Sequence, residues 1–145
     1  MRVFVTGAAG FIGSGVVPDL IAAGHTVTGL ARSDAHVETP SRMGASVLRG
    51  SLEDLDSLKR GAAEADGVIH LAFIHDFAKF AENGQIDKRA IEAMGETLAG
   101  TNKPLVVTSG VGLLAPGRLS TEEDVARLGE AIPSVSEHAA FAFAN

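Results

Sequence analysis

Three glycines near the amino terminus have the spacing of a phosphate-binding turn. They are Gly7, Gly10 and Gly13, in the stretch TGAAGFIG that directly follows the apolar run Arg2–Thr6. At a strand-to-helix turn, the first glycine permits a tight bend, the second lets backbone N–H groups approach a pyrophosphate, and the third lets the helix pack closely. The helix N-terminus adds partial positive charge. The stretch therefore predicts a dinucleotide site, with a tight turn that holds no ligand as the alternative.

The residues after the second apolar run bear on which dinucleotide would bind. The stretch LARSD places Arg32 and Ser33 ahead of Asp34. An acidic residue at this point holds the ribose hydroxyls of NAD, whereas an arginine suits the additional phosphate of NADP. The order of these residues favours NADP and leaves NAD possible.

Side chains that could transfer a proton follow the fourth and fifth apolar runs. His75, Asp76 and Lys79 come after GVIHLA, and Ser109 ends VVTSG. Histidine titrates near neutrality, and His75 and Lys79 are expected to share a helix face at i, i+4. Ser109 could hydrogen-bond a substrate oxygen. The alternatives are a solvated helix start with Asp76 as N-cap, and a serine that closes a turn.

Three further titratable side chains have weaker claims. His70 lies within an apolar run and is expected to be a packed core residue. Glu137 closes the capping-box pattern Ser134-Val135-Ser136-Glu137, which predicts a structural role. His138 is a minor candidate for the general acid.

Apolar runs alternate with helical patterns along the chain. Runs that are apolar throughout indicate a parallel sheet covered on both faces, and right-handed crossovers then give a doubly wound α/β fold with strand order 3-2-1-4-5. Pro18, inside the first helix, predicts a kink or a late helix start. The predicted strands are Arg2–Thr6, Thr26–Leu30, Ala45–Leu48, Gly67–Ala72 and Pro104–Thr108, and the predicted helices are Gly13–Ala23, Asp54–Ala65 and Ile86–Ala99.

Composition excludes several classes of function. The chain has 145 residues, of which 46% are apolar and 21% charged, and a net charge of −6 that argues against nucleic acid as a partner. It contains no cysteine, which suggests a reducing cytoplasm, and no apolar run long enough to cross a membrane. We therefore expect a cytoplasmic protein that has neither nucleic acid nor a membrane as a partner.

Together, these motifs resemble a known family. TGAAGFIG, GVIHLA and VVTSG resemble the fingerprint, fourth strand and fifth strand of the extended and atypical short-chain dehydrogenases/reductases, the NAD-dependent epimerase/dehydratase group. The resemblance implies a Rossmann fold, a nicotinamide dinucleotide, and a small carbonyl or hydroxyl substrate. By the same resemblance, the pyrophosphate is lined by Gly7, Gly10, Phe11, Ile12 and Gly13, adenine is flanked by Ser51 and Leu52, and the nicotinamide side is formed by Leu71, Ala72 and Phe73.

The departures from the family pattern concern catalysis. Family members usually use a Tyr-x-x-x-Lys pair, but this chain has no tyrosine, and the pattern places Pro133 and Glu137 at the two positions. Ser51 stands where the family usually has an acidic residue. The chain also stops where the family continues into a substrate-binding part, so residues 1–145 are expected to be a single, incomplete NAD(P)-binding domain.

Three classes of function remain open. They are an NAD(P)-dependent oxidoreductase or epimerase/dehydratase-like enzyme, a non-catalytic NAD(P)-binding sensor, and an interaction module. Catalysis would fall to Ser109, His75 and Lys79. The segment AAFAFA is apolar on every side, so a helix formed by it must be buried. By the family resemblance, we expect a homodimer through Ile86–Ala99 and Ser134–Asn145.

Overall fold

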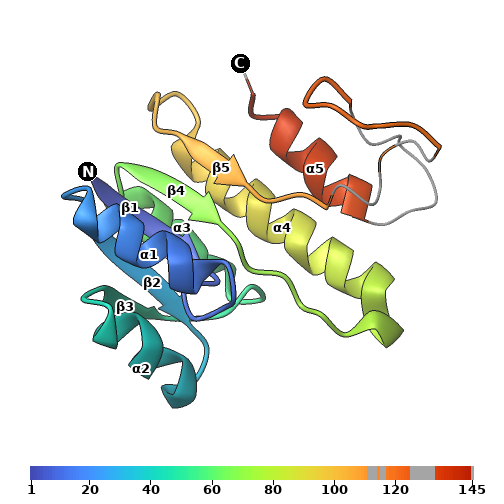
Figure 1. Ribbon diagram of the computed structural model, residues 1–145. Helices are drawn as coiled ribbons and strands as arrows, with labels where there is room; N and C mark the ends of the chain where they lie inside the picture. Colours follow the sequence, from blue (N-terminus) through green and yellow to red (C-terminus); the bar gives the residue numbers. More distant parts are fainter. Residues whose placement is uncertain (111–113, 115–116, 125–132, 145) are drawn as a thin grey trace.

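The computed structural model describes residues 1–110, 114, 117–124 and 133–144, which form a parallel sheet between two layers of helices (Figure 1). The strand order is β3-β2-β1-β4-β5, as predicted. The strands are β1 (Arg2–Thr6), β2 (Thr26–Ala31), β3 (Ser46–Arg49), β4 (Gly67–His70) and β5 (Leu105–Val107). The helices are α1 (Gly13–Ala22), α2 (Asp34–Arg42), α3 (Leu55–Glu64), the 3₁₀ turn η1 (Phe77–Lys79), α4 (Phe80–Leu98) and α5 (Pro133–Phe141).

Strand β1 lies at the centre of the sheet and buries side chains on both faces. Phe4 packs into one core with residues of α3 and α4, and Val3 and Val5 pack into the other with residues of α1. The phenyl ring of Phe4 fits against Gly61 of α3, where an added Cβ would come within 2.5 Å of the ring. Alternate residues of one strand thus hold the helices on opposite faces, which is the reason for the uninterrupted apolar pattern.

Helix α4 begins earlier than predicted and packs against α5, which lies beside it (Figure 1). It starts at Phe80 rather than Ile86, and its buried face carries Ala90 and Met94. The ring of Phe143, just after α5, lies where a Cβ on Gly95 would come within 2.5 Å. No helix in the described part of the chain is both long and apolar enough to span a bilayer.

The structure differs from the sequence analysis at the first two helices. Helix α1 begins at Gly13 with Pro18 inside it, so of the two outcomes predicted for Pro18 the late helix start is excluded. Helix α2 was not predicted at all, because its sequence DAHVETPSR is polar and contains Pro40. Tertiary packing stabilises it: Pro40 is buried and lies 3.3 Å from the position of a Cβ on Gly29 of β2.

The amino ends of the two central strands are tied by an ion pair. The Arg2 guanidinium donates to the Asp66 carboxylate at 2.7 Å, and the Arg2 backbone N–H donates to the same carboxylate at 2.7 Å. These hydrogen bonds lower the pKa of Asp66 to about 2. The pair marks the edge of the sheet opposite the glycine-rich turn.

Candidate functional site

The turn between β1 and α1 requires glycine at two positions. Gly7 has φ +70°, and a Cβ there would lie 2.8 Å from Ala72 N. A Cβ on Gly13 would lie 2.2 Å from Gly7 O. At Gly10 the nearest atom is Gly7 O at 3.2 Å, so its missing side chain leaves open space in front of the turn. The first and third glycines are therefore fixed by the fold, and the second leaves room for a ligand.

The amino end of α1 is suited to an anion. Its N-cap residue, Ile12, has no side-chain cap hydrogen bond. Gly10 N already donates to Gly7 O at 2.9 Å, and Ser14 N to Gly10 O at 2.9 Å, so these two N–H groups have backbone partners. The helix dipole still adds partial positive charge at this end, which a phosphate near Gly10 and Gly13 would meet.

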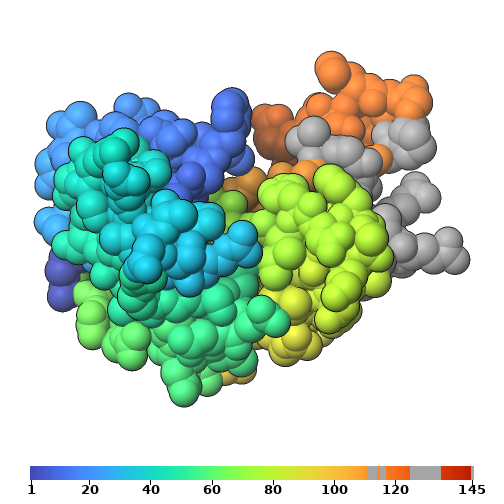
Figure 2. Space-filling view, turned by 90° about the horizontal axis from the view of Figure 1, so that it is seen from below, coloured from blue at the N-terminus to red at the C-terminus, as the bar shows by residue number. Residues whose placement is uncertain are grey.

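A cleft of about 810 Å³ runs along the carboxyl edge of the sheet. Figure 2 looks onto this edge, where the blue and cyan amino-terminal segments and the yellow-green start of α4 surround a hollow. Ligands of open α/β sheets bind outside the carboxyl ends of the strands, where the strand order reverses. The cleft is lined by Gly7, Ala9, Gly10, Phe11, Ile12, Gly13, Leu30, Arg32, His36, Gly50, Ser51, Leu52, Glu53, Leu71, Ala72, Phe73, Ile74, His75 and Asp76.

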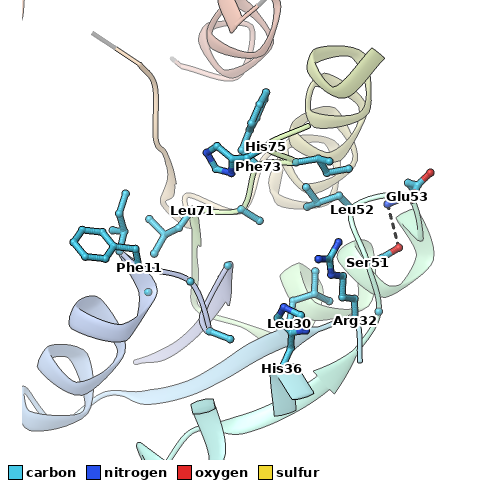
Figure 3. Close-up of a pocket in the computed structure, with 18 of the residues that line it drawn as sticks. Phe11, Leu30, Arg32, His36, Ser51, Leu52, Glu53, Leu71, Phe73 and His75 are labelled. Atoms are coloured by element: carbon cyan, nitrogen blue, oxygen red, sulfur yellow. Dashed lines mark hydrogen bonds between the residues drawn. The ribbon is translucent and has the colours of Figure 1, made fainter. Parts of the chain in front are cut away.

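One end of the cleft carries the residues after β2 and β3 (Figure 3). Arg32, His36 and Ser51 gather there, whereas Asp34 forms an ion pair with Arg49 of β3 and does not line the cleft. Ser33 does not line the cleft itself, but its Oγ hydrogen-bonds Nδ1 of His36, which does, at 2.7 Å. The sequence analysis did not identify His36 as a site residue, because it did not predict helix α2.

Leu71 and Ala72 form the wall between the two ends of the cleft, and a buried polar network holds them. Thr6 Oγ1 accepts from Leu71 N at 3.2 Å and from Ala72 N at 3.3 Å, and it lies 2.7 Å from His70 Nδ1. His70 Nε2 lies 2.9 Å from Asp87 Oδ1 of α4. His70 is a buried core residue, as expected, but it also has a polar partner on each side.

The hydrogen-bond roles in this network follow from counting lone pairs. A hydroxyl oxygen accepts two hydrogen bonds and donates one. Because Thr6 accepts two N–H groups, its proton points to His70 Nδ1, and the ring proton of His70 is on Nε2, where it donates to Asp87. Both residues before the turn therefore contact the wall formed by Leu71 and Ala72. Gly7 packs closely against its backbone, and Thr6 accepts hydrogen bonds from it.

Of the three candidate catalytic residues, only His75 is among the described residues that line the cleft, whereas Lys79 and Ser109 are not among them. His75 and Lys79 do not share a helix face, which corrects the sequence expectation. Residues 71–76 are outside any helix, and Asp76 caps η1 by accepting from Ala78 N at 3.1 Å, as in the alternative reading.

Ser109 has an acidic partner that lies far away in the sequence. Its Oγ donates to Glu137 Oε2 at 2.8 Å. The predicted capping box also involves the side chain of Ser134, which lies outside the described part of the chain, whereas Glu137 lies within α5 (Pro133–Phe141). The ring of His138 lies edge-on to Phe141 at 6.2 Å. Position 137, where the family pattern has a lysine, thus carries a carboxylate that accepts a hydrogen bond from Ser109.

Comparison with known proteins identifies the family of this chain and the solved structures that share its fold. Residues 3–124 match the NAD dependent epimerase/dehydratase family. An uncharacterized protein of Schizosaccharomyces pombe is 52% identical over 123 residues, covering 84% of this chain and 42% of the relative. Dihydroflavonol 4-reductase of Hordeum vulgare is 34% identical over 123 residues, covering 76% and 35%. UDP-glucose 4-epimerase of Bifidobacterium longum, solved with NAD+ and UDP, superposes with a TM-score of 0.76 at 20% identity, covering 99% and 48%.

The chain belongs to the NAD-dependent epimerase/dehydratase family, and its fold is the Rossmann-like fold of that family. It spans less than half the length of the relatives it matches.

Proposed function

We propose that this chain is the cofactor-binding part of an NAD(P)-dependent oxidoreductase that acts on a small carbonyl or hydroxyl compound. The observation that carries the proposal is the cleft that opens beside the Gly7–Gly13 turn and the uncapped end of α1. Phe11 and Ile12 would lie along the pyrophosphate, Ser51 and Leu52 beside adenine, and Phe73 on the nicotinamide side. The relatives include one named as a reductase and one as an epimerase.

We propose NADP rather than NAD as the preferred dinucleotide. Arg32 and His36 line the cleft, and both can donate hydrogen bonds to a phosphate. The carboxylate of Asp34, the group that would favour NAD, is paired with Arg49 and does not line the cleft. Ser33 would assist through His36 or by turning its hydroxyl to the phosphate.

Proton transfer in the proposed enzyme falls to His75, Ser109 and Lys79. These 145 residues contain no tyrosine that could act as the usual acid. The imidazole of His75, in the cleft, would exchange a proton with the substrate oxygen. Ser109 would donate to that oxygen once its hydroxyl turns away from Glu137, and Lys79 would supply positive charge. The missing tyrosine equally favours a second candidate, a dinucleotide sensor without catalysis, and hydride turnover separates the two.

We further propose a cytoplasmic homodimer, with α4 and the segment around α5 at the interface. The absence of cysteine fits a reducing compartment. Phe141, the last residue of α5, is 48% exposed, and a second copy could cover its side chain.

Calorimetric titration tests the proposed function directly. We expect saturable binding of one dinucleotide per chain, with NADP+ tighter than NAD+. A matched pair of smaller probes, adenosine 2′,5′-bisphosphate and adenosine 5′-monophosphate, isolates the contribution of the 2′-phosphate. If neither dinucleotide binds, the chain is an interaction module and the proposal is wrong.

A further inference from the structure

Four aromatic rings gather at the end of the cleft opposite Arg32. The ring of Phe73 meets those of His75 and Phe80 edge-on, with centroids 5.4 Å and 5.7 Å apart. The ring of Phe77 lies 6.4 Å from His75 and 5.9 Å from Phe80. These separations are those of favourable aromatic pairs, so the four rings form one connected cluster.

The cluster is continuous with the cleft. Phe73 and His75 are among the lining residues, and Figure 3 shows them beside one another, away from Arg32, His36 and Ser51. Phe77 and Phe80 extend the same cluster beyond the lining into η1 and the first turn of α4. A dinucleotide whose adenosine lies near Arg32 would direct its nicotinamide toward these rings.

The rings are not part of the hydrophobic core. Phe73, Phe77 and Phe80 lie outside both core clusters of the described chain, and Phe77 is 75% exposed. Clustered aromatic groups at the mouth of a cleft are typical of a ligand site, whereas packing alone would bury them.

The backbone beneath the rings is held in place. Asp76 Oδ1 accepts from Ala78 N at 3.1 Å, and the backbone oxygen of Asp76 accepts from Asn83 Nδ2 at 2.9 Å. Asn83 is buried, with 4% of its surface exposed. A buried amide therefore fixes the loop between Phe73 and Phe80, and the rings are presented on a supported turn.

We propose that this aromatic cluster binds the flat, apolar body of an aromatic carbonyl compound. The inference rests on the proposed function and names its substrate class. From Leu71 to Asp76 the wall offers two side chains that can hydrogen-bond, those of His75 and Asp76, and Asp76 already accepts from Ala78 N. Along this wall, a sugar with many hydroxyl groups would lose more hydrogen bonds to water than it could replace. A planar aromatic ligand loses none, and it can stack against the rings while its carbonyl oxygen meets His75.

Fluorescence titration of naphthaldehyde into this chain tests the proposal. The chain has neither tryptophan nor tyrosine, so emission from the probe is read against little protein background. Each titration is run with and without saturating NADP+, and cyclohexanecarboxaldehyde and UDP-glucose serve as non-aromatic and sugar-nucleotide competitors. The variants are Phe77→Ala, Phe77→Leu, which keeps apolar area without a ring, and Phe141→Ala, an exposed phenylalanine on α5 as the control.

We expect saturable binding of one naphthaldehyde per chain that NADP+ tightens. Loss of the ring in Phe77→Ala should weaken it roughly 3- to 10-fold. Phe77→Leu should recover part of this loss, and Phe141→Ala should have no effect. Unsaturable binding, equal losses in Phe77→Ala and Phe141→Ala, or equal competition by cyclohexanecarboxaldehyde would overturn the proposal. Dinucleotide affinity, measured separately, should be unchanged in all three variants. If NADP+ fails to bind while the aldehyde still binds at the rings, the proposed function fails and the aromatic site stands.

Discussion

Two glycines of helix α1, only two residues apart, are expected to respond in opposite ways to the same substitution. A Cβ on Gly13 would lie 2.2 Å from Gly7 O, whereas nothing lies within 4 Å of a Cβ on Gly15. We predict that Gly13→Ala costs about 1–3 kcal/mol through overpacking and abolishes dinucleotide binding. Gly15→Ala should raise stability by about 0.5–1 kcal/mol because alanine favours a helix. Urea unfolding and calorimetry measure both effects, and equal behaviour of the two variants would contradict this account of the turn.

Arg32 gives the second prediction at the scale of single residues. If it pairs with the 2′-phosphate of NADP, it makes a charge-assisted hydrogen bond of roughly 1.5–3 kcal/mol. Arg32→Ala should then weaken NADP+ binding roughly 10- to 100-fold and leave NAD+ nearly unchanged. Ser33→Ala should weaken NADP+ binding less.

Asp34→Ala is the matched control for the opposite choice of cofactor. Its carboxylate is paired with Arg49, so its removal should not weaken NAD+ binding. Equal losses of NAD+ and NADP+ in Arg32→Ala would show that Arg32 does not read the phosphate. A loss of NAD+ binding in Asp34→Ala would assign the ribose to the carboxylate.

Among the secondary-structure elements, β1, β4 and α4 are joined by the Thr6–His70–Asp87 network. Asp87→Asn keeps an oxygen that can accept from His70 Nε2, whereas Asp87→Ala leaves that buried donor without a partner. We predict that Asp87→Ala costs about 1–3 kcal/mol more than Asp87→Asn, the penalty for an unsatisfied buried group. Urea unfolding measures the difference, and nitrogen NMR of the His70 ring reports whether the proton stays on Nε2. Equal stability of the two variants would show that water replaces the carboxylate.

The sequence was sufficient for the sheet but not for every helix. Apolar runs such as Val3–Val5 and Val68–Ile69 predict the parallel strands, because strands buried on both faces are apolar throughout. The strand order then follows from right-handed crossovers. Helix α2 could not be predicted, since it depends on the contact of Pro40 with Gly29, two residues on different elements. The run GVIHLA also overstates β4, which ends at His70, because Ala72 N donates to the Thr6 hydroxyl beyond the end of the strand.

For the site, too, features set by the local sequence could be predicted, and features set by contacts between distant residues could not. The glycine turn depends on local backbone geometry, and its spacing is visible in the sequence. Glu137, the partner of Ser109, lies 28 residues away along the chain, and Asp87, a partner of His70, lies 17 residues away. Contacts over such separations form only when the chain folds. Local motifs therefore predicted most of the residues that line the cleft, whereas the contacts of the catalytic candidates required the structure.

For the whole molecule, the prediction concerns association. Light scattering of the chain at increasing concentration should show a dimer, because α4 and α5 are expected to pack against a second copy. Phe141→Glu, which places a charge on an exposed part of that surface, should shift the mass toward the monomer. Leu119→Glu, at a side chain that is 89% exposed outside the proposed interface, is the control. A monomeric mass at every concentration would contradict the interface.

The position of β1 at the centre of the sheet also has a consequence for synthesis. Its partner on one side is β2, but on the other side Arg2 and Asp66 are separated by 64 residues. At the usual rate of translation, roughly 3 to 13 s pass between the synthesis of these two residues. During that interval one edge of the apolar strand Val3–Val5 has no partner strand, and exposed edges of this kind recruit other chains. Nascent chains stalled shortly before Asp66 should therefore be bound more strongly by ribosome-associated chaperones than chains stalled well after Val107.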